Sequence, residues 1–560
     1  MGTYLNPDND GFLELFHSTV FVDKSFIIGK INPLIKTQGK YLCVSRPRRF
    51  GKTSIINLLV AFYSKGCDSR EIFSNLKIAQ TPNWDEKLNK YNVIQLDIQD
   101  VSGKAIYDGI NIDDYINEIV LEEFKEQFPN INFRGIKQVK KAIQKVNDET
   151  NEQFIIILDE YDVLIRENVT KEILDSYLDF LNDLFKSLST QKAIALGYLT
   201  GILPLINGDK TQSQLNNINE YSLVLPGTLA GYIGFTEDEV KEVCMKHDMD
   251  FKEMKSWYNG YNIGGITVYN PNSICEAVEH RDCDNYWTVT GTYEVISDHI
   301  LLKDNRKNDK DEDIFFKQEK EKMEENIFKL MKGEHVCFES ICGISLLKSN
   351  KNNAAYTYLI HLGYLTFCRV PKKEITNYKY CEKCYVPNRE IAEEWHKTIV
   401  SSKSEDLKFI KKLYETSLRL FEKTLDKKSD DVKKILVDYY KTRTNITTFE
   451  NEKDIQTILI EAYKLSNFKR RNYEIIQEYT PNIQKSDFIF KPKNNDFPTI
   501  IFELNHNKSI NETMKQIENK GYVQGLKDKY KKILYVLINY NSEIDNVDDR
   551  FECIIEYYTK

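Results

Sequence analysis

The stretch SRPRRFGKTS, residues Ser45–Ser54, joins two segments of different pattern. Before it, Tyr41–Val44 form a short apolar run that predicts a strand, and after it Thr53–Tyr63 carry apolar residues at helical spacing. Strand, basic loop, Gly-Lys-Thr and helix is the layout of a phosphate-binding loop, or P-loop. The sequence therefore predicts an α/β fold in which this loop leads from a parallel sheet into a helix.

Each polar position of the loop has a chemical role in this prediction. Gly51 lets the backbone approach a phosphate, Lys52 reaches the outer phosphates, and Thr53 ligates Mg²⁺. The remaining predicted nucleotide-binding residues of the loop are Arg48, Arg49, Phe50 and Ser54. Arg46 stands where the pattern G-x-x-x-x-G-K-[ST] has its first glycine. The alternative is an ordinary Gly-Lys-Thr turn in a basic loop.

A second motif, QFIIILDEYD, begins with the apolar run Phe154–Leu158 and continues with Asp159 and Glu160. Such a run predicts a strand buried on both faces of a parallel sheet. Ligand sites in these sheets lie at the carboxyl ends of the strands. We expect Asp159 to hold Mg²⁺ through its water shell and Glu160 to polarise the attacking water. The alternative is a strand that stops at a solvated acidic turn.

Two further apolar segments, Tyr91–Ile98 and Ala193–Thr200, are predicted to be strands of the same sheet. The second ends in Thr200 and Gly201, so the Thr200 hydroxyl is a candidate contact for the γ-phosphate or the attacking water. An ordinary hydroxyl at a strand end explains Thr200 equally well.

Several motifs in this order resemble the AAA-ATPase-like family of bacterial proteins. They are FVDKS (Phe21–Ser25), SRPRRFGKTS, LDEYD, YLTGILPL and WYNGY (Trp257–Tyr261), and they match over roughly residues 5 to 300. The resemblance implies an ASCE-type P-loop ATPase that uses ATP and Mg²⁺, with the basic loop as the family's own form. The roles of Arg46, Arg48 and Arg49 stay open between phosphate, acid, partner-subunit and DNA contacts.

That family often ends in a nuclease-fold domain of the PD-(D/E)XK type, and the pattern after about residue 451 resembles its core. Segments with strand pattern begin at residues 473, 485, 499 and 532, with helical patterns before the first and after the third. The positions that match the family's site are Glu452 or Glu461, Asp487, Glu503, Asn505, Gln516 and Tyr522. The resemblance implies that Asp487 and Glu503 hold Mg²⁺ against a scissile phosphate.

Asn505 departs from the nuclease pattern, because the family has a lysine at that position. Asparagine donates a hydrogen bond but carries no charge. Lys508 would point to the opposite face on a continuing strand, unless the chain bends at Asn507. The sequence leaves two functions open. One is an ATPase coupled to a DNA-acting nuclease-like domain, and the other is a nucleotide-gated switch or adaptor with an inactive nuclease-fold scaffold.

Length and local patterns predict four parts: a P-loop domain at 1–233, a helical lid at 234–300, a mostly helical connector at 301–445 and the nuclease-like domain at 446–560. Thr236 and Glu239 form a predicted capping box. The charged run at 303–313 predicts a solvated linker. The aromatic residues around WYNGY either contact a base or pack the lid.

Composition excludes some classes of protein. No apolar run reaches the eighteen or so residues of a membrane helix, and no secretion signal is recognisable at the N-terminus. A net charge of −8 gives no global attraction to nucleic acid. Eleven scattered cysteines suit a reducing cytoplasm, and Cys381 and Cys384 lack a second ligand pair for zinc. Oligomerisation cannot be assigned from these patterns.

Overall fold

The chain forms two compact units. In the computed structural model the described residues are 2–167, 169–204, 215, 217–287, 310–339, 351–371, 380–402, 405–444, 452–468, 472–476, 488–493, 497–507 and 532–559. Unit 1 comprises Met1–Thr288 with Cys337–Glu390, and unit 2 comprises Val289–Val336 with Ile391–Lys560. The four-part division expected from the sequence stays a prediction.

The centre of unit 1 is a five-stranded parallel sheet with the order β2-β3-β4-β1-β5. Its strands are β1 (Tyr41–Ser45), β2 (Asn92–Asp97), β3 (Phe154–Asp159), β4 (Ile194–Gly201) and β5 (Asn219–Tyr221). Every residue of β1, β3 and β4 is buried, as a sheet covered on both faces requires. The predicted strands are confirmed, and β4 lies between the loop strand β1 and the acidic strand β3.

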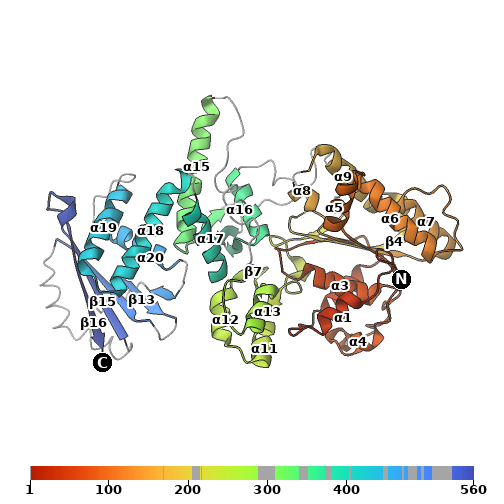
Figure 1. Cartoon of the computed structure of the whole chain (residues 1–560), viewed down its shortest axis with the longest axis horizontal. Helices are drawn as coiled ribbons and strands as arrows, with labels where there is room; N and C mark the ends of the chain where they lie inside the picture. The colour runs from red at the N-terminus through yellow and green to blue at the C-terminus, as the bar shows by residue number, and fades with distance from the viewer. Residues whose placement is uncertain are drawn as a thin grey trace. The chain divides into compact units, whose positions relative to one another are not determined.

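Helices cover both faces of this sheet (Figure 1). One face carries α1 (Asp10–Phe16), α3 (Lys52–Tyr63) and α4 (Arg70–Ser74), while the other carries α5 (Ile98–Asp108), α6 (Ile112–Gln127), α7 (Val139–Thr150) and α9 (Lys171–Phe185). The shorter helices are α2 (Phe26–Ile31), α8 (Val163–Arg166) and α10 (Leu188–Ala193). The α5–α9 side and the sheet share one continuous apolar core.

A small α/β segment follows the parallel sheet. Its antiparallel strands are β6 (Phe235–Thr236), β8 (Ile266–Tyr269) and β7 (Tyr261–Ile263), and its helices are α11 (Glu237–His247), α12 (Phe251–Tyr258) and α13 (Pro271–His280). The capping box is confirmed, because Glu239 N donates to Thr236 Oγ1 and Thr236 N donates to Glu239 Oε2. Tyr258, Tyr261 and Tyr269 are buried, so these aromatic rings pack the segment.

The stretch 337–390 of unit 1 returns to the P-loop. It contains α16 (Lys351–Leu362), β10 (Thr366–Pro371) and β11 (Tyr380–Tyr385), which joins β9 (Val336–Phe338) in a sheet of order β10-β11-β9. Tyr261 Oη donates to the carbonyl of Gly363 at 2.8 Å. A Cβ on Gly363 would lie 2.9 Å from Pro47 Cβ, so the turn after α16 packs directly on the loop.

Unit 2 is built on a second five-stranded sheet, in which β14 and β15 are parallel and the other neighbours antiparallel. Its strands are β12 (Tyr473–Ile476), β13 (Phe488–Pro492), β14 (Thr499–His506), β15 (Lys532–Tyr540) and β16 (Phe551–Thr559). Sequence patterning missed β16. The helices α18 (Glu405–Leu425), α19 (Ser429–Thr444) and α20 (Glu452–Ser466) lie on one face (Figure 1). Also helical are α15 (Lys310–Met331) and α17 (Arg389–Ser401).

Part of the charged run expected to be a linker is helical, which corrects that prediction. Helix α15 begins at Lys310, so residues 310–313 form its first turn. The earlier residues of the run lie outside the described part of the chain.

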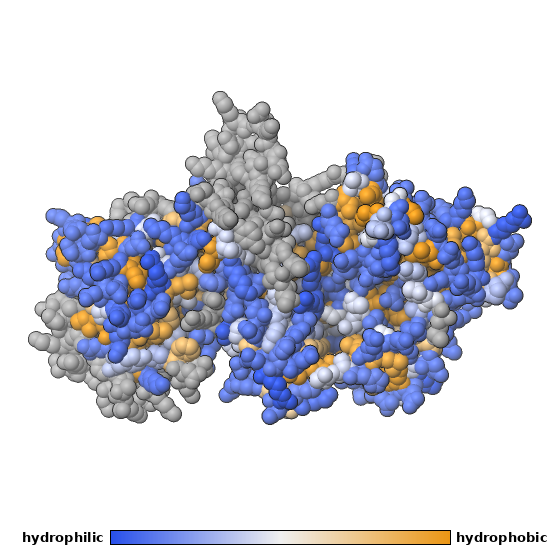
Figure 2. All heavy atoms as spheres, in the orientation of Figure 1, coloured by the Kyte–Doolittle hydropathy of each residue, from blue (hydrophilic) through white to orange (hydrophobic). Residues whose placement is uncertain are grey.

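The surface is mainly polar in the view of Figure 2, with apolar side chains gathered over α8 and α9. Within the described ranges, no helix combines the length and the apolar composition needed to span a bilayer.

Candidate functional site

The P-loop has the local geometry that an anion site requires. Gly51 adopts φ +83° and ψ 27° at the N-cap of α3, a left-handed conformation that glycine tolerates at little cost. The turn directs the chain into α3, whose first amides have no partners within the helix. A helix N-terminus also favours negative charge. The backbone at Gly51–Thr53 thus has the geometry that the predicted phosphate cradle requires.

A direct hydrogen bond joins the loop to the acidic strand. Thr53 Oγ1 donates to Asp159 Oδ2 at 2.7 Å, although 106 positions separate the two residues in sequence. Asp159 is 4% exposed. Burial raises the pKa of Asp159 to about 6, and the nearby Glu160 adds to this, while the Thr53 bond and Lys52 oppose it. The carboxylate is therefore placed where an added cation would stabilise it.

Lys52 points along the loop toward Glu160. Its Nζ donates to the carbonyl of Pro47 at 3.3 Å and lies 3.5 Å from Glu160 Oε1. The Lys52 side chain is almost fully buried, so its charge depends on these oxygens. Glu160 adopts φ +49°, an uncommon conformation for a residue with a side chain. The lysine and the predicted base therefore meet at the end of β3.

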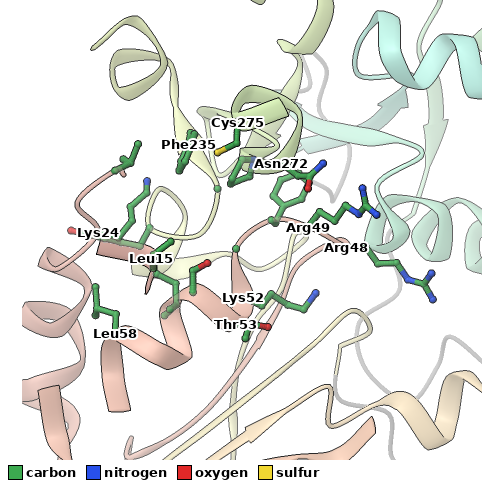
Figure 3. A pocket seen from close by; sticks show the side chains of 18 of the residues that line it. Leu15, Lys24, Arg48, Arg49, Lys52, Thr53, Leu58, Phe235, Asn272 and Cys275 are labelled. Atoms are coloured by element: carbon green, nitrogen blue, oxygen red, sulfur yellow. The ribbon is translucent and has the colours of Figure 1, made fainter. Parts of the chain in front are cut away.

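These residues open into a cavity of about 640 Å³, within the size range of small-molecule sites. One part is polar and includes Lys52, Thr53 and Glu160. The other part is apolar and comes from the N-terminal segment, α3 and the β6–α13 segment: Phe12, Leu15, Val20, Phe21, Val22, Ile55, Leu58, Phe235 and Cys275. In Figure 3, Phe235 and Cys275 lie across the cavity from Leu15 and Leu58.

The three arginines of the loop have different environments. Arg46 is fully buried, and its guanidinium donates to the carbonyls of Ser45 and Tyr221 at 2.8 and 2.9 Å. Burial lowers the pKa of Arg46 to about 10. Arg46 therefore fastens β1 to the chain near β5. Arg48 and Arg49 are exposed at the cavity and extend away from its apolar part (Figure 3).

The other predicted nucleotide contacts divide into two groups. Phe50, Gly51 and Ser54 line the cavity with Lys52 and Thr53. Thr200 is the penultimate residue of β4, 1% exposed, and pairs with Val44 of β1. It is not among the described residues that line the cavity, and its contact with phosphate or water stays a prediction.

Sequence patterns missed several cavity residues. Arg166 lines the cavity and forms an ion pair with Glu160, and Gln99 reaches it from the first turn of α5. Lys24 also lines it, with Nζ 2.6 Å from Glu239 Oε2. Signals were present for two of them. Arg166 follows Asp162 by four residues, a helical spacing for an ion pair, and Lys24 lies within the quoted FVDKS motif.

The described oxygen groups suit a magnesium ion. Mg²⁺ prefers oxygen ligands and is commonly held by one or two carboxylates with substrate phosphates. The Thr53 hydroxyl and the Asp159 carboxylate are already 2.7 Å apart, and no described lysine, arginine or histidine forms a direct ion pair with this buried carboxylate. These two residues would hold the ion, Thr53 as a ligand and Asp159 through its water shell, and this assignment stays a prediction.

In unit 2 the predicted metal ligands are only partly described. Asp487 lies outside the described residues, as do Lys508, Gln516 and Tyr522, and the Glu452 side chain is not described either. Glu503 and Asn505 share one face of β14. Phe502, on the opposite face, stacks with Phe488, and its ring centroid lies 4.4 Å from that of Tyr463 in α20. Glu503 and Asn505 thus face away from the helices.

Glu461, the described candidate acid on α20, occupies a different place. Its carboxylate accepts from Arg443 Nε at 2.9 Å and lies 3.4 Å from Lys332 Nζ. Tyr439 Oη donates to the same carboxylate at 3.3 Å. Since Tyr463 faces the sheet and Glu461 is two residues earlier on the helix, Glu461 points away from β14. The structure therefore does not bring Glu461 beside Glu503.

The cysteine pair lies in a strand. Cys381 and Cys384 belong to β11, which pairs with β10, and Cys384 is buried. Among side chains that the structure describes, no group of three or more His, Cys, Asp or Glu residues is arranged to hold a metal ion. The Cys381 side chain lies outside the described part of the structure, so the interpretation as two unlinked thiols in a hairpin stays a prediction.

Part of the chain is similar to known proteins. Residues 12–210 match the model of a family described as "Predicted AAA-ATPase". An uncharacterized protein in the vnfD 5′ region of Azotobacter chroococcum mcd 1 is 26% identical over 276 residues, which cover 48% of this chain and 50% of that protein. The matched part thus spans about half of this relative. The family match indicates an ATP-binding P-loop protein. The matched range includes Lys52, Thr53, Asp159 and Glu160.

Proposed function

We propose that unit 1 binds ATP with Mg²⁺ and hydrolyses the phosphoanhydride bond between its β- and γ-phosphates, giving ADP and inorganic phosphate. The hydrogen bond between Thr53 and Asp159 carries this proposal, because it places the hydroxyl and the carboxylate together at the start of α3. Lys52 binds the outer phosphates, and Glu160 orients and deprotonates water at the end of β3. When bound between Thr53 and Asp159, Mg²⁺ neutralises charge on the phosphate oxygens.

The shape of the cavity supports a nucleotide rather than a bare phosphate. Its apolar part has room and chemistry for a base beside the polar loop. The choice of ATP over other nucleoside triphosphates rests on the family match. Measuring how much each of four nucleoside triphosphates raises the free energy of unfolding tests that choice.

The main test compares three variants of the full chain. Lys52→Ala is expected to abolish hydrolysis and weaken ATP binding, since the phosphates lose their cation. Glu160→Gln is expected to lower turnover by at least about 100-fold while ATP binding is retained. Lys65→Ala is the matched control, because Lys65 is a surface lysine that pairs with Glu152 at 2.6 Å. Turnover by Lys52→Ala at the wild-type rate would refute the assignment of the P-loop.

A second function is proposed for unit 2, as a nuclease-like domain that contacts DNA. It rests on the strand order of three antiparallel strands followed by a parallel one, and on Glu503 and Asn505 on one face. Asp487 immediately precedes β13, whose Phe488 pairs with Phe502. The competing proposal is an inactive scaffold that relays the nucleotide state to a partner.

DNA cleavage with Mg²⁺ or Mn²⁺ separates these two proposals. Single- and double-stranded DNA are incubated with wild type, Asp487→Ala and Asn505→Lys. Cleavage by wild type that is lost in Asp487→Ala supports the nuclease and contradicts the scaffold. Cleavage by Asn505→Lys alone supports a site that has lost its catalytic lysine.

A further inference from the structure

One guanidinium bridges two acids beside the proposed hydrolysis site. Arg166, at the end of α8, places Nη2 against Glu160 Oε2 and donates from Nε to Asp162 Oδ2 at 3.0 Å. Its side chain is 10% exposed and lines the cavity. A nearly buried arginine that uses two nitrogens on two carboxylates is held far more rigidly than a surface ion pair.

Asp162 is itself anchored by backbone. Its side chain is fully buried, and Oδ2 accepts from Leu203 N at 2.8 Å and from Ile202 N at 3.2 Å. Gly201 makes this approach possible, because a Cβ there would lie 2.3 Å from Asp162 Oδ1. Tyr161 N also donates to the carbonyl of Thr200 at 3.0 Å. These hydrogen bonds join the turn after β3 to the turn after β4, and Arg166 is bound to this junction through Asp162.

Glu160 lies between two cations. Lys52 is 3.5 Å from Oε1, and Arg166 contacts Oε2. Phosphate would draw Lys52 away from Glu160, because a polyphosphate carries more negative charge than one carboxylate. Arg166 has no such freedom, since Asp162 holds its other nitrogen. The positive φ of Glu160 needs support from surrounding structure, and Arg166 supplies a contact at the end of that side chain.

We propose that Arg166 is a positioning residue that orients the Glu160 carboxylate for its work on water, with Asp162 as the anchor that fixes Arg166. The inference rests on the proposed ATPase function and adds residues that it does not contain. Arg166 acts through Glu160 and is not a ligand of the nucleotide. Its effect therefore falls on turnover rather than on nucleotide affinity.

The experiment is a double-mutant cycle in the full chain between Arg166→Ala and Glu160→Gln. Steady-state ATP hydrolysis gives kcat and KM, and a non-hydrolysable ATP analogue gives Kd. Arg166→Ala is expected to lower kcat about 10- to 100-fold and to change Kd by less than about threefold. In the Glu160→Gln background, Arg166→Ala is expected to have no further effect, because the group it orients is already inactive.

Two more variants exclude a purely structural effect. Arg166→Lys is expected to restore part of kcat, since lysine can reach Glu160 but cannot bond both acids with a fixed fork. Arg70→Ala is the control, because Arg70 forms an exposed single pair with Asp85 at 2.6 Å, and its kcat should equal that of wild type. Thermal unfolding confirms that each variant is folded.

Several outcomes would overturn the inference. An unchanged kcat in Arg166→Ala, with wild type active, removes the positioning role and leaves the ATPase proposal intact. A large rise in Kd at constant kcat would make Arg166 a phosphate ligand instead. Multiplicative losses in the double variant would show that Arg166 acts independently of Glu160. Absence of hydrolysis by wild type would instead contradict the proposed function.

Discussion

Asp159 in unit 1 and Glu461 in unit 2 are buried almost equally, at 4% and 5% exposure, yet their surroundings are opposite. Glu461 has an arginine, a lysine and a tyrosine hydroxyl around one carboxylate. The Asp159 carboxylate accepts hydrogen bonds from the Thr53 hydroxyl and from the backbone N–H of Glu160, and the second acid, Glu160, directly follows it. On sequence grounds Asp159 was a candidate magnesium ligand, and Glu461 was, with Glu452, a candidate for the helix acid of a nuclease-like site.

The comparison separates an acid whose charge is compensated within the fold from an acid whose charge is not. The charge of a buried carboxylate with well-placed cations is compensated within the protein. Removing that carboxylate leaves the cations without a counter-charge. A buried carboxylate with a raised pKa is destabilised as an anion until a cation arrives. Burial alone therefore does not identify a site, whereas burial together with incomplete charge compensation does.

The largest expected effect concerns turnover. Asp159→Asn should lower ATP hydrolysis by about 100- to 1,000-fold, because the amide is a poorer ligand for the cation. The same variant should not destabilise the nucleotide-free protein, since it removes a costly buried charge. Hydrolysis assays measure the turnover and urea unfolding measures the free energy of unfolding, each with Glu461→Gln for comparison. Normal hydrolysis by Asp159→Asn would erase the distinction between the two acids.

Glu461→Gln should show the reverse pattern. Arg443 and Lys332 would lose their common counter-charge, and a broken buried pair costs about 3–5 kcal/mol of unfolding free energy. The unfolding transition of unit 2, followed in urea, is the measurement. Glu325→Gln is the control, because Glu325 forms an exposed pair with Lys329 at 2.7 Å and should change stability by less than about 1 kcal/mol. Equal effects of both variants would contradict a structural role for Glu461.

The sequence predicted the parts of the site that are local in the chain. Gly51, Lys52 and Thr53 are consecutive, and the apolar run before Asp159 predicts a strand buried on both faces of a parallel sheet, as β3 is. The strands on either side followed from the same pattern. The pairing of Thr53 with Asp159 was then a consequence of parallel topology, because carboxyl ends of such strands share one edge.

The parts that escaped prediction depend on contacts between distant residues. The burial of Arg46 depends on carbonyls of Tyr221 and Leu229, which no pattern around the loop reveals. The packing of Gly363 on Pro47 joins positions that are more than three hundred residues apart in sequence. Glu461 matched a nuclease position by order alone, and only the neighbouring helices show that its charge is already used.

A smaller effect is expected from pH. The pKa of Asp159 is about 6 in the folded chain against 3.8 for the ordinary carboxyl, so the folded state holds its proton more tightly. Stability from this group is present below about pH 4 and is lost as pH rises through about 6, by up to about 3 kcal/mol. Asp159→Asn should remove this loss, which urea unfolding at about pH 5 and about pH 7.5 measures.

Magnesium and nucleotide should offset the stability that is lost when Asp159 ionises, because Mg²⁺ binds the ionised carboxylate and competes with the proton. The stabilisation by Mg²⁺ with ADP is therefore expected to be larger at about pH 7.5 than at about pH 5. Wild type and Asp159→Asn with parallel pH dependence would contradict the assignment of the raised pKa to this residue.

The smallest effect concerns the packing of Gly363 against Pro47 of the loop. Gly363 has φ +89°, and an added Cβ would lie 2.8 Å from Trp287 Cη2 and 2.9 Å from Pro47 Cβ. Gly265 has φ +86° with nothing within 4 Å of the added Cβ, so it incurs the same backbone strain without the contact. Gly363→Ala should therefore destabilise unit 1 by about 1–2 kcal/mol more than Gly265→Ala in urea unfolding. Equal losses would mean that Pro47 yields freely, and that the loop beside Asp159 is not held from this side.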